Sequence, residues 1–166
     1  MRAVVLFLLL LASGVTYAGS TADFFAQGAY TGMQLSLADA EKQGKIPSTA
    51  AFCLKALKHS QLVPVIESLL RTSLTADELT KSDAFYSSGA GQKIAKQGLL
   101  QIYAAKGHTP PEAMPAFTAK ERNEINTFSI TKAGTKLFKE RVLETPAARK
   151  AVSDKIQEMV QSCRPR

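Results

Sequence analysis

The sequence predicts an all-α protein: a single helical domain of six to seven helices that contains two repeated helical hairpins. In most windows of the chain, apolar residues recur three and four positions apart, which is the spacing of one helix face. There is no sustained alternation of apolar and polar residues and no Asn-Gly or Asp-Gly hairpin turn. The pattern Thr-x-x-Glu, which starts helices, occurs twice ahead of helical segments.

The segment from Met1 to Ala18 has the pattern of a secretory signal peptide. Arg2 precedes an uninterrupted apolar run from Ala3 to Ala12, and the segment closes on small residues that suit cleavage after Ala18. The apolar run is shorter than the about 20 residues that cross a bilayer. We therefore expect a periplasmic or secreted domain, residues 19–166, with no stable membrane insertion after cleavage.

The charge is positive but not dense. The chain has 21 Lys and Arg against 14 Asp and Glu, a formal net charge of +7. This surplus, with few aromatic residues to stack on bases, argues against nucleic-acid binding. From Lys132 onward there are nine basic and four acidic residues. The basic C-terminal helix is either a solvated face or a surface that approaches an acidic partner or anionic lipid.

The only two cysteines, Cys53 and Cys163, are expected to form a disulfide in an oxidising compartment. Such a bridge would close a loop of about 110 residues and, on the chain-entropy view, contribute up to about 5 kcal/mol. Cys163 falls on one helical stripe with the apolar residues Val152, Ile156, Met159 and Val160, so it is expected to face the core. A structural bridge is therefore preferred to a reactive thiol.

The N-terminal third predicts two helices and a break. The first helix is expected over Ala22 to Gln43, ending before a glycine and a proline, and the second carries Phe52 and Cys53. Pro64 then interrupts the path before the apolar pattern resumes.

The aromatic residues fall into two sets. Those at core spacing are expected in the core: Phe52, Phe85, Phe117, Phe128 and Phe138. Those near the mature N-terminus either pack the first helix or form a partner-binding edge: Phe24, Phe25 and Tyr30.

An internal repeat occupies the second half of the chain. A shift of 43 residues places the segment 74–100 over 117–143 without a gap. Two copies are too few for a solenoid and predict two hairpins in one core. The residues of this structural motif are Thr75, Glu78, Phe85, Ser88, Gly91 and Lys93 in the first copy and Thr118, Glu121, Phe128, Thr131, Gly134 and Lys136 in the second.

The matched positions predict structural roles. Each Thr-x-x-Glu is a capping box at a helix start, and Ser88 and Thr131 are expected to cap the next helix. Gly91 and Gly134 are expected to face inward, where a side chain would hold two helices apart. The run from Ser87 to Lys93 lacks the spacing of a phosphate-binding loop, and the second copy replaces Gly89 with Lys132. We interpret the run as a tight corner between helices.

The motif Leu-Thr-x-x-Glu-Leu, followed by Phe85-Tyr86-x-Ser88-x-x-Gly91-x-Lys93, resembles a family of secreted bacterial proteins known as domain of unknown function 2059. That family typically has proline where this chain has Gly89, and the second copy has Phe128-Ser129 in place of Phe-Tyr. The resemblance covers a minor part of the chain, namely the first copy of the motif and, less closely, the second. It implies a signal peptide, a periplasmic helical domain and no established chemistry.

Chemistry-bearing residues are sparse. His59 and His108 have no His or Cys neighbour at metal-ligand spacing, so no metal and no cofactor is expected. There is no Gly-x-Ser-x-Gly elbow. The acidic pairs Asp77/Glu78 and Glu121/Glu124 are reminiscent of glycosidase carboxylates, but two of these residues are assigned to caps and the chain has no Trp for sugar stacking. We therefore predict no catalytic residue and no enzymatic activity.

The functional expectation is a non-enzymatic helical domain that binds another component of the cell envelope, with a protein partner. One alternative is a secreted inhibitor or immunity-type protein that occludes a toxin or an enzyme. A further alternative is an envelope hydrolase. The sequence leaves the partner, the physiological role and the oligomeric state open.

Overall fold

The computed structural model describes residues 19–163, and in this range the chain is helical with no strand, which confirms the predicted fold class. The predicted signal peptide and the C-terminal end of the chain, residues 164–166, lie outside the described residues. No helix between residues 19 and 163 is long and apolar enough to cross a membrane. The α-helices are α1 (Ser20–Lys42), α2 (Ser48–Ala56), α3 (Val63–Ser73), α4 (Ala76–Ser87), α5 (Gly89–Ala105), α6 (Ala119–Ser129), α7 (Lys132–Gly134) and α8 (Pro146–Gln161). Three short segments connect them: η1 (His59–Gln61), η2 (Thr135–Lys139) and η3 (Val142–Glu144).

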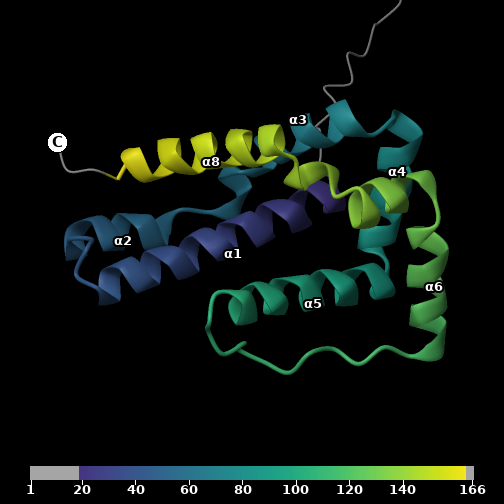
Figure 1. Ribbon diagram of the computed structural model, residues 1–166, viewed down its shortest axis with the longest axis horizontal. Coiled ribbons are helices and arrows are strands. Elements are labelled where there is room, and N and C mark those ends of the chain that lie inside the picture. The colour runs from purple at the N-terminus through teal and green to yellow at the C-terminus, as the bar shows by residue number, and fades with distance from the viewer. Residues whose placement is uncertain (1–18, 164–166) are drawn as a thin grey trace, which may run out of the picture.

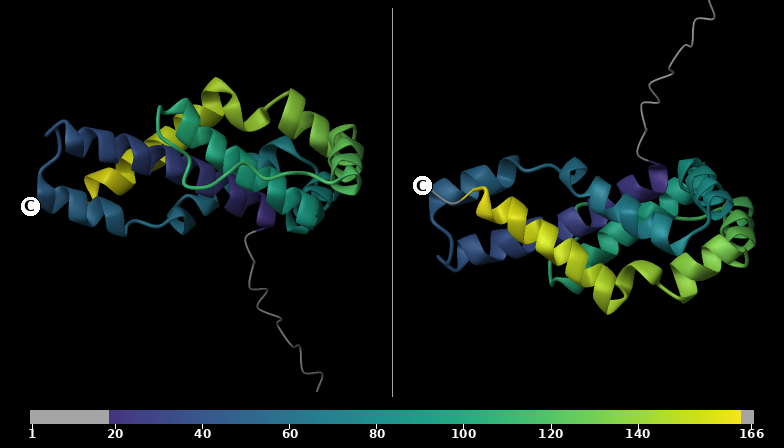
Figure 2. Two further views of the ribbon diagram at one scale, coloured as in Figure 1. Left: turned by 90° about the horizontal axis from the view of Figure 1, so that it is seen from below. Right: turned by 90° about the horizontal axis from the view of Figure 1, so that it is seen from above.

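The long helix α1 runs through the middle of the molecule (Figure 1). In that view α8 lies above α1 and α5 lies below it, while α4 and α6 stand across one end. The views in Figure 2 show that α8 crosses α1 at an angle. The extended segment after α5 returns along that helix to the start of α6 (Figure 1). Helix α1 contacts α2, η1, α3, α4 and α5, and so organises the N-terminal half of the core.

The start of α1 is held by α4. The Thr21 amide donates to the Asp83 carboxylate at 3.0 Å, and the Ser20 hydroxyl donates to the Asp83 carbonyl at 2.7 Å. Gly19, the N-cap residue, provides no side-chain cap of its own, so a carboxylate from another helix satisfies a free amide at the positive end of the helix dipole. A side chain at position 19 would overlap Asp83, because a Cβ there would meet its carboxylate oxygens.

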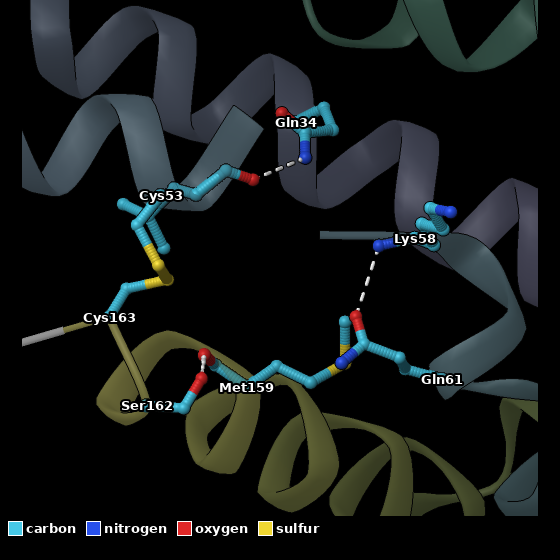
Figure 3. Close-up of a disulfide and its surroundings, with 8 residues drawn as sticks. Gln34, Cys53, Lys58, Gln61, Met159, Ser162 and Cys163 are labelled. Atoms are coloured by element: carbon cyan, nitrogen blue, oxygen red, sulfur yellow. Dashed lines mark hydrogen bonds between the residues drawn. A yellow bond between two sulfur atoms is a disulfide. The ribbon is translucent and has the colours of Figure 1, made fainter. Parts of the chain in front are cut away.

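The predicted disulfide between Cys53 and Cys163 is present (Figure 3). It joins α2 to the end of the chain that follows α8, with the two Cα atoms 5.6 Å apart and a sequence separation of 110. Cys163 is buried, as its place on the apolar stripe of α8 predicts. Nearby, the Gln34 side chain donates to the Leu54 carbonyl at 2.9 Å and ties α2 to α1 (Figure 3). The bridge therefore fixes the C-terminal end of α8 on the α1–α2 pair.

The core is formed by α1, α3, α4 and the second hairpin, and its most enclosed large residues are Leu62 and Leu70. Pro64 lies in the first turn of α3, where its missing amide costs no hydrogen bond. The prediction that Phe52 is a core residue was wrong, because its side chain is 82% exposed. Helix α2 instead buries Ala51 and Leu54.

The second hairpin departs from the first after its cap. In the first hairpin α5 continues for 17 residues, whereas α7 is a single turn that passes into the π-helical segment η2. The helical path then ends at Arg141, which has a left-handed φ of 52°. An ion pair from Arg141 to Glu144, at 2.6 Å, spans this bend. Beyond the bend, Thr145 caps α8 and Pro146 lies in the first turn of that helix.

The two junction glycines face the end of the preceding helix. A Cβ at Gly91 would lie 1.9 Å from the Phe85 carbonyl oxygen, and a Cβ at Gly134 would lie 2.0 Å from that of Phe128. Both contacts are with backbone, which cannot move aside as a flexible side chain can. Ser88 ends α4 and also caps α5, so a single residue separates the two helices. The absence of a side chain is what allows so short a corner.

We predict that Gly91→Ala or Gly134→Ala lowers the free energy of unfolding by about 1–3 kcal/mol, because one methyl group overlaps backbone in a packed corner. Gly89→Ala is the matched control, since nothing lies within 4 Å of a Cβ at that first position of α5. The control is expected to be neutral or slightly stabilising. Urea titration followed by circular dichroism measures all three variants. Equal stability of Gly91→Ala and Gly89→Ala would contradict the close approach.

Candidate functional site

The sequence motif builds two matching helix starts. Thr75 Oγ1 accepts from the Glu78 amide at 3.3 Å, and the Thr75 amide donates to Glu78 Oε2 at 2.8 Å. In the second hairpin, Thr118 Oγ1 accepts from the Glu121 amide at 3.2 Å, and the Thr118 amide donates to Glu121 Oε2 at 2.8 Å. Both predicted capping boxes are therefore formed, which satisfies free amides at the starts of α4 and α6.

The following corners match as well. Ser88 Oγ accepts from the Gly91 amide at 3.1 Å, and Thr131 Oγ1 accepts from the Gly134 amide at 3.0 Å. These are the predicted second caps, at the starts of α5 and α7. The corner amides are thus bonded to a side chain of the protein itself, in agreement with a structural rather than a phosphate-binding role.

The repeated lysines and glutamates form ion pairs between the two hairpins. Lys136 of the second hairpin lies 2.7 Å from Glu78 of the first, and Lys93 of the first lies 2.7 Å from Glu121 of the second. Each lysine also donates to a carbonyl that precedes the capping box of the other hairpin: Lys136 to Ser73 at 3.0 Å, and Lys93 to Ala116 at 3.3 Å. We call the ion pairs Lys136–Glu78 and Lys93–Glu121 the crossed ion pairs.

The crossed ion pairs flank a stacked aromatic pair. The rings of Phe85 and Phe128, which are equivalent in the repeat, stack with centroids 4.0 Å apart and planes within 5°. Helix α4 contacts α7, and α5 contacts α6, so the helices also pair across the two hairpins. In an interface with two-fold symmetry, a residue contacts either its equivalent in the other half or, if residue i contacts j, the equivalent of j also contacts the equivalent of i. The stacked rings are contacts of the first kind, and the crossed ion pairs are contacts of the second kind. The two hairpins therefore pack on each other as the halves of a symmetric dimer do, within one chain.

The capping glutamates are more acidic than ordinary glutamates. Hydrogen bonds from Lys93 and the Thr118 backbone lower the pKa of Glu121 to about 2. The same contacts, from Lys136 and the Thr75 backbone, lower the pKa of Glu78. Both carboxyl groups are therefore ionised near neutral pH and are occupied by protein donors, which makes them unsuitable as general acids.

No role beyond a match in the repeat was predicted for Lys93 and Lys136. A signal was present in the sequence: a lysine follows the capping glutamate at the same spacing in both copies, where neither a cap nor a core position requires a charge. Spacing within one copy does not show which glutamate each lysine meets. The exchange between copies depends on how the hairpins pack, and this became visible only in the structure.

A separate feature, which we call the α1–α8 groove, is a cavity of about 570 Å³. Its floor is α1, and its walls come from α8, η3, Ile66 of α3 and the residue that follows α5. Most lining side chains are apolar. They are Phe25, Ala29, Gly32, Met33, Leu37, Ile66, Leu143, Val152, Ile156 and Val160, with Ser36, Lys106, Glu144, Arg149 and Ser153 as the polar residues. A cavity of this size and composition falls in the range of small-molecule sites in proteins.

The groove exists because α8 packs mainly on α3 and η3. Small residues on α1, namely Ala29, Gly32 and Ser36, deepen the floor. From the sequence, Phe25 was expected to pack the first helix or form a partner-binding edge, and the apolar stripe of α8 was expected to face the core. The groove itself was missed, because a helix face turned toward a neighbour has the same period whether or not the two are in contact.

The charged residues of the groove are cationic on balance. Glu144 is shared by Arg141 at 2.6 Å and Arg149 at 3.4 Å. Across the groove, Lys106 donates to the Ser36 hydroxyl at 3.0 Å and forms no ion pair with another residue in the range 19–163. Elsewhere on α8 the charges pair with neighbours on the same helix, as Lys150 does with Asp154. Lys150 and Asp154 are exposed, as on a solvated helix face, whereas Arg149 lines the groove.

A second open cavity, of about 600 Å³, lies between α4 and α6 over the stacked Phe85 and Phe128. Its remaining lining is largely polar, with Lys81, Lys120 and Asn123 among the residues around it. This cavity is the outer face of the contact between the two hairpins. We regard the α1–α8 groove as the candidate site because ten of its fifteen lining residues are apolar, against three of nine here.

The two histidines serve α1. His59 Nε2 lies 2.9 Å from Asp23, and His108 Nε2 lies 3.1 Å from Asp39, so η1 and the segment after α5 are each attached to the helix. Within the described part of the chain, no group of three or more His, Cys, Asp or Glu residues is arranged to hold a metal ion. The two carboxylates of the acidic pair Asp77/Glu78 have different partners: Asp77 pairs with Lys81, and Glu78 belongs to the crossed ion pairs.

Comparison with known proteins gave no match to any family model, to any curated protein or to any solved structure. The resemblance to domain of unknown function 2059 therefore stays a prediction. The function of the chain is inferred below from its own geometry.

We predict that acid destabilises the protein through the capping glutamates. A carboxyl group with a lowered pKa in the folded state contributes stability above its unfolded pKa, near 4.5, and loses it as the pH falls toward about 2. Glu121→Gln should therefore be less stable than wild type at pH 7, and the two should converge near pH 2. Urea titrations at a series of pH values measure the difference.

The matched control is Glu124→Gln, which removes a carboxyl group on the same helix, outside the crossed ion pairs. Its stability relative to wild type is expected to change less between neutral pH and strong acid. If both variants followed the same pH profile, Lys93 would not be the cause of the effect at Glu121.

Proposed function

We propose that this is an exported, non-enzymatic binding protein of the cell envelope that holds its target in the α1–α8 groove. The single observation that carries the proposal is the groove itself: an apolar cavity of about 570 Å³, bordered by a few charged residues. Sites of this kind enclose an apolar group and orient it through a small number of polar contacts.

Export is supported by two independent features. The segment from Met1 to Ala18 has the pattern of a signal peptide. The Cys53–Cys163 bridge is of the kind that persists in oxidising compartments, and it holds the C-terminal end of α8 beside the groove.

A binding role is supported by the chemistry of the groove. Its polar lining consists of two serines, one lysine, one arginine and one glutamate, and the glutamate is already shared by two arginines. Both histidines, the commonest kind of general base, are bonded to aspartates on α1 outside the groove lining. These residues suit recognition of a charged or apolar group better than proton transfer.

The proposal predicts contact between the target and α8 on one face only. A photo-crosslinking residue at Ser153, which is exposed and lines the groove, should yield a discrete crosslinked product in cells that export the protein. The same residue at Ala147 is the matched control, because Ala147 is also exposed on α8 but does not line the groove. Mass spectrometry of the products identifies the target.

Equal products from both positions, or none from Ser153, would contradict the proposed site. A single stoichiometric protein product with enzymatic activity would instead favour the inhibitor alternative. Cleavage of peptidoglycan or an ester by the purified protein, lost when one carboxylate or histidine is changed, would favour the hydrolase alternative.

A further inference from the structure

We infer that the groove binds a single-chain amphiphile with an anionic head group, such as a free fatty acid or a lysophospholipid. The inference rests on the proposed function and names the class of ligand for the same site. Three properties of the groove carry it: its length, its volume and the position of its charges.

The apolar floor is long and continuous. It extends along α1 from Phe25 to Leu37, a stretch of helix that covers about 18 Å. Apolar side chains from Met33 on α1 and from Val152, Ile156 and Val160 on α8 line it along the way. This shape matches an extended acyl chain of medium length.

The volume suits a single acyl chain. The cavity of about 570 Å³ lies within the range of sites that enclose small molecules. A single acyl chain is narrow enough to be enclosed, and each methylene that it buries tightens binding about fourfold.

The charges place an anionic head group at one end. Lys106, directly after α5, lies over Ser36 and has no carboxylate partner among residues 19–163. Asp39, which follows Ser36 along α1, is bonded to His108. The Ser36 hydroxyl accepts from Lys106 and donates to the Gly32 carbonyl at 2.9 Å, so the free donors here are those of the Lys106 ammonium. A carboxylate or phosphate beside Lys106 would gain a cation, while its chain followed α1 toward Phe25.

The far end of the groove agrees with this orientation. Phe25 belongs to an aromatic group with Phe24 and Tyr86, whose ring centroids lie 4.9 to 5.9 Å apart. An apolar chain end would meet Phe25, the member of this group that lines the groove, without burying a charge. Arg149 and Arg141 share Glu144 on the opposite wall, so that wall adds positive charge without adding a free carboxylate.

The experiment is calorimetric titration of the disulfide-bonded mature protein with three probes below their micelle concentrations: laurate, lauroyl-lysophosphatidate and the neutral monolaurin. Both anionic probes are expected to bind more tightly than monolaurin. Tighter binding of laurate would identify a free fatty acid as the source of the head group, and tighter binding of lauroyl-lysophosphatidate would identify a lysophospholipid.

Two pairs of variants locate the site. Ser153→Trp should abolish binding of all three probes by filling the groove, whereas Ala147→Trp, outside the groove on α8, should not. Lys106→Met keeps the aliphatic stem and should weaken both anionic probes about three- to fivefold, as for loss of one partly exposed ion pair, without affecting monolaurin. Lys150→Met is the matched control and should change nothing. Circular dichroism checks that each variant is folded.

Equal binding of monolaurin and laurate, unchanged by Lys106→Met, would overturn the anionic head group. If no probe bound while crosslinking at Ser153 still captured a protein, the inference would fall and the proposed function would stand. If neither the probes nor crosslinking gave a groove-specific result, both would fall.

Discussion

Two lysines, each reaching from one hairpin to the capping glutamate of the other, hold the second half of this protein together. The glutamates already accept hydrogen bonds from the amides of the threonines that cap their own helices, at 2.8 Å in both cases. The lysines add a charge and a donor to carboxylates that are mostly shielded from water, with 8% and 19% of their side chains exposed. An ion pair of this kind is costly to break on one side, because the remaining charge is left without its partner. The helix starts and the packing of the hairpins are thereby linked: a change at either cap disturbs the contact between the two halves.

This arrangement also determines where α8 lies. The second hairpin ends at Arg141, turns through η3 and enters α8 at Pro146, so the position of the hairpin sets the start of that helix. The disulfide sets its end, on α2. Helix α8 is held at both ends and rests on α3 between them, and it spans the apolar face of α1 without filling the space above it. The groove lies along α8 between these two attachments, and the small residues Ala29 and Gly32 of α1 are part of its lining.

The local features of this fold were predictable, whereas most of the long-range ones were not. Capping residues, helix breaks and the junction glycines act within a few positions of the chain, and Thr75, Ser88 and Gly91 reveal their roles by spacing alone. The disulfide was predictable because only two cysteines are present. Phe52 was misjudged because a large aromatic residue is usually buried, and no pattern in the short helix α2 shows which side meets α1. The partners of Lys93 and Lys136, and the space between α1 and α8, depend on distances between elements far apart in sequence, and periodicity carries no information about those distances.

The claim that ion pairs between the hairpins hold them together is tested most directly by a double-mutant cycle on the crossed ion pairs. Glu78→Gln and Lys136→Met are measured alone and together by urea titration at pH 7. The double variant should lose less stability than the sum of the two single variants, because each single change leaves the other group unpaired. The cycle on Glu121 and Lys93 should show coupling of the same sign. The within-hairpin combination of Glu78→Gln with Lys93→Met should be additive. Additive losses in both crossed cycles, or stronger coupling within a hairpin than between hairpins, would contradict the claim that these lysines hold the two halves together.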